Sequence, residues 1–368
     1  MSETGAEASA WHREPVPDTH GRCLAPEAGA WHPGPVPGTP RRSWPLPRLP
    51  LVAQFRYASG MATGKLWIVL NPTAGKGKAA RKRGVIERIL SESGRAFETL
   101  LTKGPGDAQH IARELPLGLD DVTVAAGGDG TCNEVVNGLL SRHSDAPPLF
   151  GILPIGRGND FAFTPGIPCD AEGAARALVS GKTRPLDIGL VKGGDFPDGR
   201  YFANGVGIGF DTKVGLEAAK MKIKSGLSYA LGALITLARY EPSPVVRVRY
   251  GETDLTMPAV LVSVVNGRRM GGVFYMGPNA VLDDGLLDFC AVRRHPSRLG
   301  IVKIILKYTK GTQAGCAGVH MGASGHFLIE ALEGGLVAHC DGETLCLDGK
   351  SLEISCLPGA LRLVGSAP

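Results

Sequence analysis

The sequence predicts an α/β N-terminal domain with a parallel, doubly wound sheet, followed by a β-rich, sandwich-like C-terminal domain. Apolar runs of strand length alternate with helical patterns between residues 66 and 191, as in βαβ units that bury a parallel sheet under helices. Short strand patterns dominate after residue 245, as in antiparallel sandwiches. The chain has 368 residues, 43% of them hydrophobic, which is enough for two cores of ordinary size.

The expected elements of the N-terminal half alternate in type. Continuous apolar runs mark buried strands, and apolar residues at a spacing near 3.6 mark helices. Strands are expected at residues 66–70, 97–102, 122–126, 149–153 and 186–191. Helices are expected at residues 77–93, 106–115, 132–141 and 169–180.

The C-terminal half begins with Val and Arg alternating over residues 245–250, which is the period of a half-buried strand. Further strands are expected at residues 259–265, 287–292, 327–330, 336–339, 344–347 and 352–356, and helices at 213–237 and 297–310. Asp348 and Gly349 stand between the last two strands and predict a two-residue hairpin turn.

Residues 1–60 differ from the rest of the chain, because they hold 10 of its 27 prolines and no lysine. Proline-rich composition of this kind favours extended, unpacked chain. We expect a disordered leader, or an upstream stretch included through an early start codon. A proline-rich recognition arm is the alternative. The two expected domains then cover residues 62–183 and 184–368.

Composition and charge exclude several classes of protein. The net charge of +5, with a pI near 8.7, is too weakly basic for a protein that coats nucleic acid. It is compatible with an anionic substrate or membrane surface. The longest apolar stretch, residues 227–238, is too short to span a bilayer, and the N-terminus has no apolar signal-peptide core. The eight cysteines show no C-x-x-C pair or zinc spacing and are expected to be thiols in a reducing cytoplasm.

The strongest local feature is the run Gly-Gly-Asp-Gly-Thr at residues 127–131, which follows an expected strand and opens an expected helix. Glycines let the backbone approach an anion closely, and the free N–H groups at a helix start favour phosphate. Thr131 and Glu134 have the spacing of a capping box, which would fix the start of the helix. A tight structural turn is the alternative. The position at the carboxyl end of a parallel strand favours a phosphate site.

Two other loops are expected at the same edge of the sheet. Residues 71–78 follow the first strand but lack the spacing of a Walker A motif. Residues 156–160, Gly-Arg-Gly-Asn-Asp, follow the strand at 149–153. Either loop alone is a weak signal, whereas three loops at the carboxyl ends of the strands of one parallel sheet predict a single site.

These motifs, with others that follow them, resemble the diacylglycerol kinase catalytic-domain family, bacterial lipid kinases related to sphingosine and ceramide kinases. The family's hallmarks occur here in order. They are the Asn-Pro loop at 71–75, Gly-Gly-Asp-Gly-Thr at 127–131, Gly-x-Gly-Asn-Asp at 156–160, Leu-Asp-Ile-Gly at 186–189, Asn-Gly-Val-Gly-Ile-Gly-Phe at 204–210, Gly-Gly at 271–272 leading to Asp-Asp-Gly-Leu-Leu-Asp at 283–288, and Asp-Gly-Glu at 341–343. NAD kinases and phosphofructokinases share Gly-Gly-Asp-Gly, so that loop alone is weak evidence, whereas the full ordered series is specific. The resemblance implies a phosphofructokinase/NAD-kinase-like domain that binds the nucleotide and a second domain that binds lipid.

The resemblance also implies roles for individual residues. Nucleotide contacts are implied for Asn71, Thr102, Gly127, Gly128, Asp129, Gly130, Thr131, Cys132, Asn133 and Arg157. Ligands of Mg²⁺ are implied for the side chain of Asp284 and the carbonyls of Val281 and Leu286. A group of carboxylates that would steady the metal through water comprises Asp129, Asp160 and Asp187. Glu343 matches the general base that takes the proton of the lipid hydroxyl.

Some of these positions have a second interpretation. The Asp-Gly pairs at 284–285 and 341–342 are also ordinary signals for hairpin turns. Arg157 departs from the family, which has Thr or Ser at this position. Its guanidinium could pair with a phosphate or turn outward.

The expected function is ATP- and Mg²⁺-dependent phosphorylation of a lipid hydroxyl, that of diacylglycerol or a related lipid alcohol. The alternatives are a small-molecule kinase of the NAD kinase or phosphofructokinase type, and a catalytically silent nucleotide or lipid sensor. Cations that flank two expected helices form either a solvated face or a surface for anionic headgroups. They are Lys213, Lys220, Lys222, Lys224, Arg293, Arg294, Arg298, Lys303, Lys307 and Lys310. The expected partners are the lipid alcohol and, peripherally, the anionic inner face of the membrane, with a homodimer as one possible assembly and no nucleic acid.

Overall fold

The structure, a computed structural model, describes residues 62–144, 146–220, 243–294 and 297–365, and the single positions 232, 235, 236 and 239. The expected leader at residues 1–60 lies outside the described residues, as does most of the chain expected to continue a helix beyond residue 220. The described residues belong to one compact unit.

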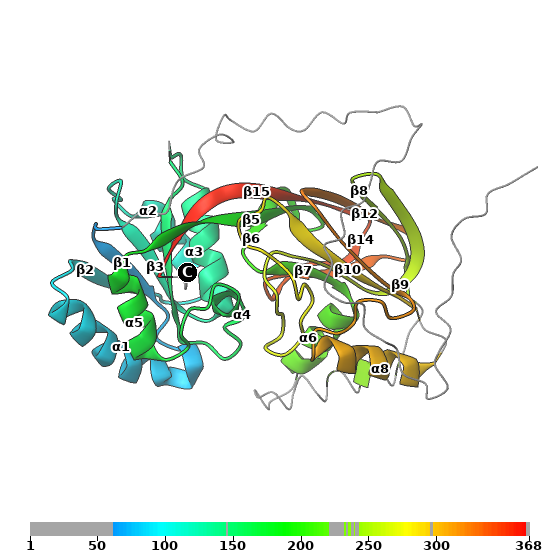
Figure 1. The fold of residues 1–368 in the computed structure, drawn as a ribbon, viewed down its shortest axis with the longest axis horizontal. Coiled ribbons are helices and arrows are strands. Elements are labelled where there is room, and N and C mark those ends of the chain that lie inside the picture. The colour runs from blue at the N-terminus through cyan, green and yellow to red at the C-terminus, as the bar shows by residue number, and fades with distance from the viewer. Residues whose placement is uncertain are drawn as a thin grey trace, which may run out of the picture. The chain divides into compact units, whose positions relative to one another are not determined.

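The N-terminal half is a parallel sheet covered by helices, as expected. Its strands are β1 (Leu66–Leu70), β2 (Phe97–Leu101), β3 (Val122–Gly127) and β4 (Leu149–Pro154), paired in the order β2-β1-β3-β4. Its helices are α1 (Ala74–Glu92), α2 (Asp107–Glu114), α3 (Asp129–Leu140), α4 (Asp160–Phe163) and α5 (Ala171–Ser180). Helix α1 packs against α5 and α2 packs against α3, and the strands lie between these two pairs (Figure 1). The sheet is therefore doubly wound.

The C-terminal half is rich in strands, also as expected. Its strands are β5 (Thr183–Gly193), β6 (Phe196–Phe202), β7 (Gly205–Gly209), β8 (Val245–Tyr250), β9 (Thr253–Val265), β10 (Leu287–Arg293), β11 (Val319–Ser324), β12 (His326–Glu333), β13 (Leu336–Cys340), β14 (Glu343–Gly349) and β15 (Ser351–Val364). Two helices of this half are α6 (Phe210–Lys220) and α8 (Arg298–Tyr308). The sequence patterns missed β6, β7 and β11, because each is short and interrupted by glycine or small polar residues.

Two antiparallel layers face each other and form a sandwich. One layer contains β8, β12, β15, β5 and β6, and the other contains β14, β13, β7, β9, β10 and β11. The rings of Tyr250, Phe289 and Phe327 meet between the layers, with centroids 5.1 to 5.8 Å apart. Strand β9 takes part in both layers, because residues 253–258 pair with β8 and residues 261–265 pair with β7.

The hairpin expected at Asp348 and Gly349 is wrong. Strand β14 pairs with β13, whereas β15 pairs with β12 and β5 in the opposite layer. The turn at these residues thus carries the chain from one layer to the other. The two-residue hairpin turn of this region is formed by Asp341 and Gly342, both with positive φ (46° and 91°), between the paired residues Cys340 and Glu343.

Strands β5 and β15 join the two halves. The final part of β15 pairs in parallel with β4, through Arg362 with Leu149, and antiparallel with the start of β5. Leu361, Leu363 and Val364 are buried in the core of the parallel sheet, while the first residues of β15 are buried in the sandwich. The expected domain boundary at residues 183 and 184 falls at the beginning of β5, and both strands contribute to both cores.

Two further expectations concern the cysteine side chains and membrane-spanning helices. The seven cysteines of the described ranges carry free thiols, as expected, and four of the seven are fully or nearly fully buried in the two main cores. Among the described helices, none is long and apolar enough to cross a lipid bilayer.

Because β15 closes the first core, we expect Leu363→Ala to destabilise the protein by about 2–5 kcal/mol, the usual cost of truncating a fully buried leucine. Urea unfolding would measure this change in the free energy of unfolding. The control is Leu332→Ala, at a leucine that is 53% exposed, which should change stability by no more than about 0.5 kcal/mol. Equal effects of the two substitutions would contradict the role assigned to β15.

Candidate active site

Three loops meet at the carboxyl ends of β1, β3 and β4, as the sequence predicted. The backbone N–H of Asn71, after β1, donates to the carbonyl of Ala126 on β3 (3.0 Å). The side-chain amide of Asn71 donates to Oγ1 of Thr131 (3.3 Å). After β4, the N–H groups of Ile155 and Gly156 both donate to the carbonyl of Gly127 (2.7 and 3.0 Å). These bonds bring the loops together into one surface.

Glycine is required where two of these loops touch. A Cβ added at Gly156 would lie 2.4 Å from Cα of Gly128, and real Cβ atoms do not come that close to backbone. The loop after β4 therefore packs backbone against backbone on the loop after β3. This close approach gives the Gly-x-Gly motif at 156–158 a structural reason.

Helix α3 begins in this surface, and its N-cap residue, Gly128, has no side chain with which to cap the first amides. The N–H of Cys132 donates to the carbonyl of Gly128 (3.1 Å), so the amides of residues 129–131 precede the first intrahelical bond. Such amides, at the positive end of the helix dipole, favour an anionic group such as phosphate.

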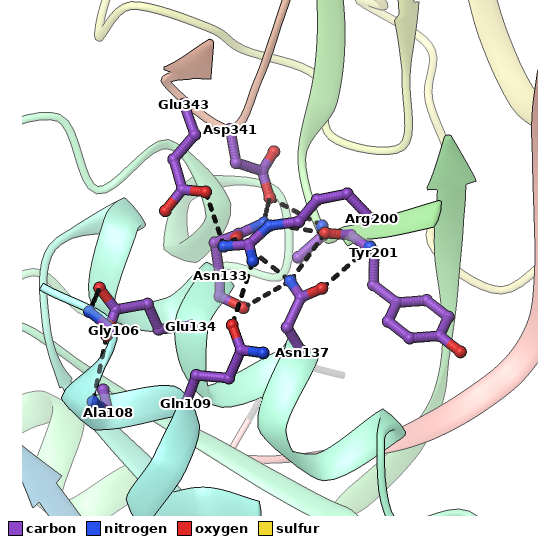
Figure 2. A network of polar contacts seen from close by, with 11 residues as sticks. Gly106, Ala108, Gln109, Asn133, Glu134, Asn137, Arg200, Tyr201, Asp341 and Glu343 are labelled. Atoms are coloured by element: carbon purple, nitrogen blue, oxygen red, sulfur yellow. Dashed lines mark hydrogen bonds and ion pairs between the residues drawn. The ribbon is translucent and has the colours of Figure 1, made fainter. Parts of the chain in front are cut away.

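The expected capping box at the start of α3 is wrong. The carboxylate of Glu134 accepts hydrogen bonds from the N–H groups of Gly106 (2.9 Å) and Ala108 (3.1 Å), at the start of α2 (Figure 2). Oγ1 of Thr131 accepts from Asn71. The helix begins at Asp129, with Gly128 as its N-cap residue, so Thr131 lies inside the helix and cannot cap it. The Glu134 carboxylate instead caps amides at the start of α2.

Two of the expected metal-network carboxylates stand beside these loops. Burial and the neighbouring carboxylates of Asp160 and Asp341 raise the pKa of Asp129 to about 6. Asp160 is ion-paired with Arg269 (2.8 Å) and accepts from the N–H of Gly272 (2.9 Å). Asp160 thus ties the loop after β4 to the Gly-Gly motif of the sandwich.

The third carboxylate, Asp187, belongs to a different group. It accepts from the N–H groups of Gly285 (2.6 Å) and Gly359 (2.7 Å) and so holds the loop that bears Asp284. Burial, with Asp284 close by, raises the pKa of Asp288 to about 6. The only ion pair described for this acidic loop joins Asp283 to Arg184 (3.0 Å).

This acidic loop is chemically suited to Mg²⁺, which prefers carboxylate, carbonyl and water oxygens and takes one or two protein carboxylates. Asp284 is exposed, as are Val281 and Leu286 on either side of it. Among the described residues, no three His, Cys, Asp or Glu side chains converge on one point. The expected set, with one carboxylate and two carbonyls, does not require such a cluster.

The Asp341–Gly342 turn is both a hairpin turn and part of the site. The carboxylate of Asp341 accepts hydrogen bonds from the N–H groups of residues 203, 204 and 205 (2.9, 3.1 and 2.8 Å). It also accepts from the side-chain amide of Asn133 (3.0 Å). Burial raises the pKa of Asp341, and the four donors oppose this shift. The turn is thereby fixed against the β6–β7 connection and α3.

Glu343 follows this turn directly and forms a 2.6 Å ion pair with Arg200 of β6. Its side chain is 38% exposed, whereas that of Arg200 is 12% exposed. Burial raises the pKa of Glu343, and the Arg200 guanidinium opposes the shift. Glu343 is thus a partly open carboxylate held by a nearly buried cation (Figure 2).

The side chains of Asn133 and Cys132, two of the expected nucleotide contacts, are both engaged inside the protein. The amide of Asn133 donates to Tyr201 and Asp341 and accepts from Arg200 and Asn137, which uses its whole hydrogen-bonding capacity. The Cys132 side chain is buried in the core of the parallel sheet. Only the backbone of these two residues is available to a nucleotide.

The remaining expected positions lie at the same surface or its rim. Thr102, at the end of β2, is buried, and its N–H donates to the carbonyl of Leu70 (2.9 Å). Arg157 is exposed on the loop after β4. Sequence reasoning missed Arg200, Gln109 and Arg269, because none lies in a recognisable motif and their partners are distant in sequence.

The fold and site define a class: an α/β half with three loops at the carboxyl ends of its strands, joined to a sandwich that carries a carboxylate next to helix α3. Residues 65–191 match the diacylglycerol kinase catalytic domain, and residues 204–365 match the YegS C-terminal NAD kinase beta sandwich-like domain. The chain belongs to the diacylglycerol kinase catalytic-domain family.

Individual relatives agree with this assignment. The chain is 34% identical to a diacylglycerol kinase of Bacillus subtilis over 230 residues, covering 62% of this chain and 73% of the relative. It is 32% identical over 277 residues to a Pseudomonas aeruginosa protein named "Probable lipid kinase YegS-like", covering 74% and 85% of the two chains. A crystal structure described as a diacylglycerol kinase from Bacillus anthracis superposes with a TM-score of 0.61 at 25% identity, covering 83% of this chain and 97% of that one.

The close contact between loops yields a test. We expect Gly156→Ala to destabilise the protein by about 1–3 kcal/mol, because the new methyl group must displace the backbone at Gly128. Thermal and urea unfolding would measure the change. The control is Gly84→Ala on α1, where an added Cβ meets no atom within 4 Å and alanine should stabilise the helix by up to about 1 kcal/mol. A Gly156→Ala protein as stable as the wild type would show that the two loops do not pack as described.

Proposed function

We propose that this protein is an ATP- and Mg²⁺-dependent lipid kinase that phosphorylates the hydroxyl of diacylglycerol or a related lipid alcohol. The observation that carries the proposal is the link between Glu343 and α3. Glu343 pairs with Arg200, Arg200 donates to Asn133, and Asn133 lies on the helix whose first amides form the anion site. A proton acceptor and a phosphate site are therefore parts of one network.

The nucleotide phosphates would bind where the three loops meet. The amides at the start of α3 would donate to phosphate oxygens, with Asn71 and Thr102 at the same edge of the sheet. Arg157, exposed at the tip of its loop, would contribute a charge-assisted contact. Gly127 and Gly128 would let the phosphates approach the backbone.

Asp284, with the carbonyls of Val281 and Leu286, would hold Mg²⁺. The bound ion would neutralise phosphate charge, which is the main requirement of phosphoryl transfer. Asp187 keeps this loop in place through its bonds to Gly285 and Gly359. Asp160 keeps the nucleotide loop against the sandwich through Arg269 and Gly272.

Glu343 would act as the general base. Its Oε2 is engaged by Arg200, which leaves Oε1 for the acceptor hydroxyl. As the lipid oxygen forms its bond to the γ-phosphorus, the hydroxyl proton passes to Glu343 and the bond to the leaving ADP oxygen breaks. The products are a phospholipid and ADP.

Helix α8 suggests how the enzyme would reach its substrate. Its inner face buries Ile301, Ile304 and Tyr308 against the sandwich. Its outer face presents Leu299 and Leu306, which are 75% and 59% exposed. Exposed cations lie among and beside these leucines: Arg298, Lys303, Lys307 and Lys310. A mixed face of leucine and lysine fits an anionic bilayer, which accepts apolar side chains and attracts cations.

The general-base role predicts the effect of Glu343→Gln. Turnover should fall by roughly 10²-fold or more with ATP binding nearly unchanged, because the amide cannot accept the hydroxyl proton. The assay follows radiolabelled phosphate from ATP to diacylglycerol, a sphingoid base, phosphatidylglycerol and a polyprenol in mixed micelles.

The matched control is Glu330→Gln, which removes the same charge from the ion pair with Arg249 elsewhere in the sandwich and should leave turnover unchanged. If Glu343→Gln keeps turnover within a factor of about three, Glu343 is not the base. If the wild type labels none of the lipids, the lipid-kinase proposal fails.

The membrane contact predicts that Lys303→Glu/Lys307→Glu lowers binding to anionic vesicles by at least about tenfold, since each cation contributes about 1 kcal/mol. Sedimentation with vesicles of phosphatidylglycerol and phosphatidylcholine would measure this. The control is Lys192→Glu/Lys350→Glu, the same charge change at exposed lysines outside α8. Equal loss of binding in both double variants would show only a net-charge effect.

A further inference from the structure

We propose that Arg200 is a positioning residue for catalysis: it aims Glu343 at the acceptor hydroxyl and couples that aim to the nucleotide-binding helix. This inference rests on the proposed function, because it assigns Glu343 the role of base. It goes beyond the family motifs, since Arg200 lies on β6 outside all of them.

Both terminal nitrogens of Arg200 are engaged by polar side chains. One terminal nitrogen, Nη1, donates to Oε1 of Gln109 on α2 (3.0 Å). The other, Nη2, donates to Oδ1 of Asn133 on α3 (2.8 Å) and pairs with Oε2 of Glu343 (2.6 Å). Three segments far apart in sequence thus converge on one guanidinium (Figure 2).

This arrangement is more than is needed to neutralise one carboxylate. The planar guanidinium is a rigid fork, so fixing it at Gln109 and Asn133 fixes the direction in which it meets Glu343. Its Nε is buried and has no hydrogen-bond partner among the described residues. The direction of the guanidinium therefore depends on its two terminal nitrogens, which contact Gln109, Asn133 and Glu343.

Asn133 connects this clamp to the nucleotide site. Its carbonyl oxygen accepts from Arg200, and its N–H₂ group donates to Asp341 in the turn before Glu343. Asn133, near the start of α3, therefore contacts both groups that hold Glu343: Arg200, its ion-pair partner, and Asp341 of the preceding turn. A shift of α3 when phosphate binds at its start would move Glu343 with it.

The charges that face Glu343 determine the sign of the expected pH effect. Arg200 lowers the pKa of Glu343, while Glu134 of α3 and Asp341 of the turn raise it, together with burial. Without Arg200, the two acids and burial remain. The pKa of Glu343 should then rise. A carboxylate acts as a base only when it is ionised. As the pH is lowered, the variant should therefore lose activity at a higher pH than the wild type does.

The test compares Arg200→Met with Arg200→Lys by pH profiles of kcat for transfer from ATP to diacylglycerol in mixed micelles. For Arg200→Met we expect kcat near pH 7 to fall by at least about tenfold and the acid limb to move up by about one pH unit. Lysine keeps the charge without the fork. Arg200→Lys should therefore keep the acid limb near its wild-type position while kcat still falls.

The control is Arg249→Met. Arg249 likewise forms a 2.8 Å ion pair with a glutamate, Glu330, and has a buried Nε without a partner. It lies on β8, and its ion pair joins β8 to β12, neither of which contributes a residue to the network of α2, α3, β6 and the Asp341–Glu343 segment. Its loss should leave both kcat and the acid limb unchanged.

A double variant separates this inference from the proposed function. In a Glu343→Gln protein, Arg200→Met should lower the residual kcat by less than twofold, because Arg200 acts through Glu343.

An unshifted acid limb in Arg200→Met would overturn the inference. So would an equal fall in kcat when Arg200→Met is introduced into the wild type and into the Glu343→Gln protein. If Arg200→Met does not fold, an unchanged kcat in Arg200→Lys would overturn it. If Glu343→Gln alone keeps full turnover, the general-base role assigned to Glu343 in the proposed function fails instead.

Discussion

The candidate site depends on the hydrogen bonds that the buried carboxylate of Asp341 accepts. This carboxylate is surrounded by three consecutive backbone N–H groups of the β6–β7 connection and by the amide of Asn133. A carboxylate withdrawn from water is tolerated only where polar groups replace its hydration. The turn that bears Asp341 can therefore occupy this position only while α3 and the β6–β7 connection both stand beside it. Glu343 is the next residue after that turn. The contacts that hold Asp341 in place therefore also fix the position of the candidate base.

Charge is distributed unevenly around this network. Asp129 and Asp160 lie beside the three loops of the parallel sheet, where burial and neighbouring acids raise the pKa of Asp129. Asp187, Asp284 and Asp288 lie at the acidic loop, where burial and neighbouring acids raise the pKa of Asp187 and of Asp288. Repulsion of this kind reduces the stability of the protein without its ligands. A cation that binds the folded state alone would relieve the repulsion and stabilise that state. The same electrostatics that make the acidic loop unfavourable by itself suit it to a divalent cation.

Sequence patterns predicted most elements and misassigned some of their partners. The apolar runs of β1, β3 and β4 identified buried parallel strands correctly, since burial on both faces leaves a continuous apolar pattern. Strand β7, Gly-Val-Gly-Ile-Gly, was missed because glycine lacks the side chains that a strand pattern consists of. The hairpin at Asp348 and the capping box at Glu134 were wrong for a common reason. Each was inferred from neighbours in sequence, whereas the pairing partner in the fold is more distant.

The sequence by itself determined the fold class, the meeting of three loops at one edge of the parallel sheet, and the position of Glu343 after an Asp-Gly turn. These properties depend on local spacing: the period of apolar residues, the glycines of loops, and the rule that parallel strands present their carboxyl ends together. The tertiary structure alone decided that β15 closes both cores, that Asn133 faces the interior, and that Arg200 holds Glu343. A buried arginine is directed by whichever acceptors surround it, and here those acceptors come from α2, α3 and β14. Only the packing of the two halves brings these elements together.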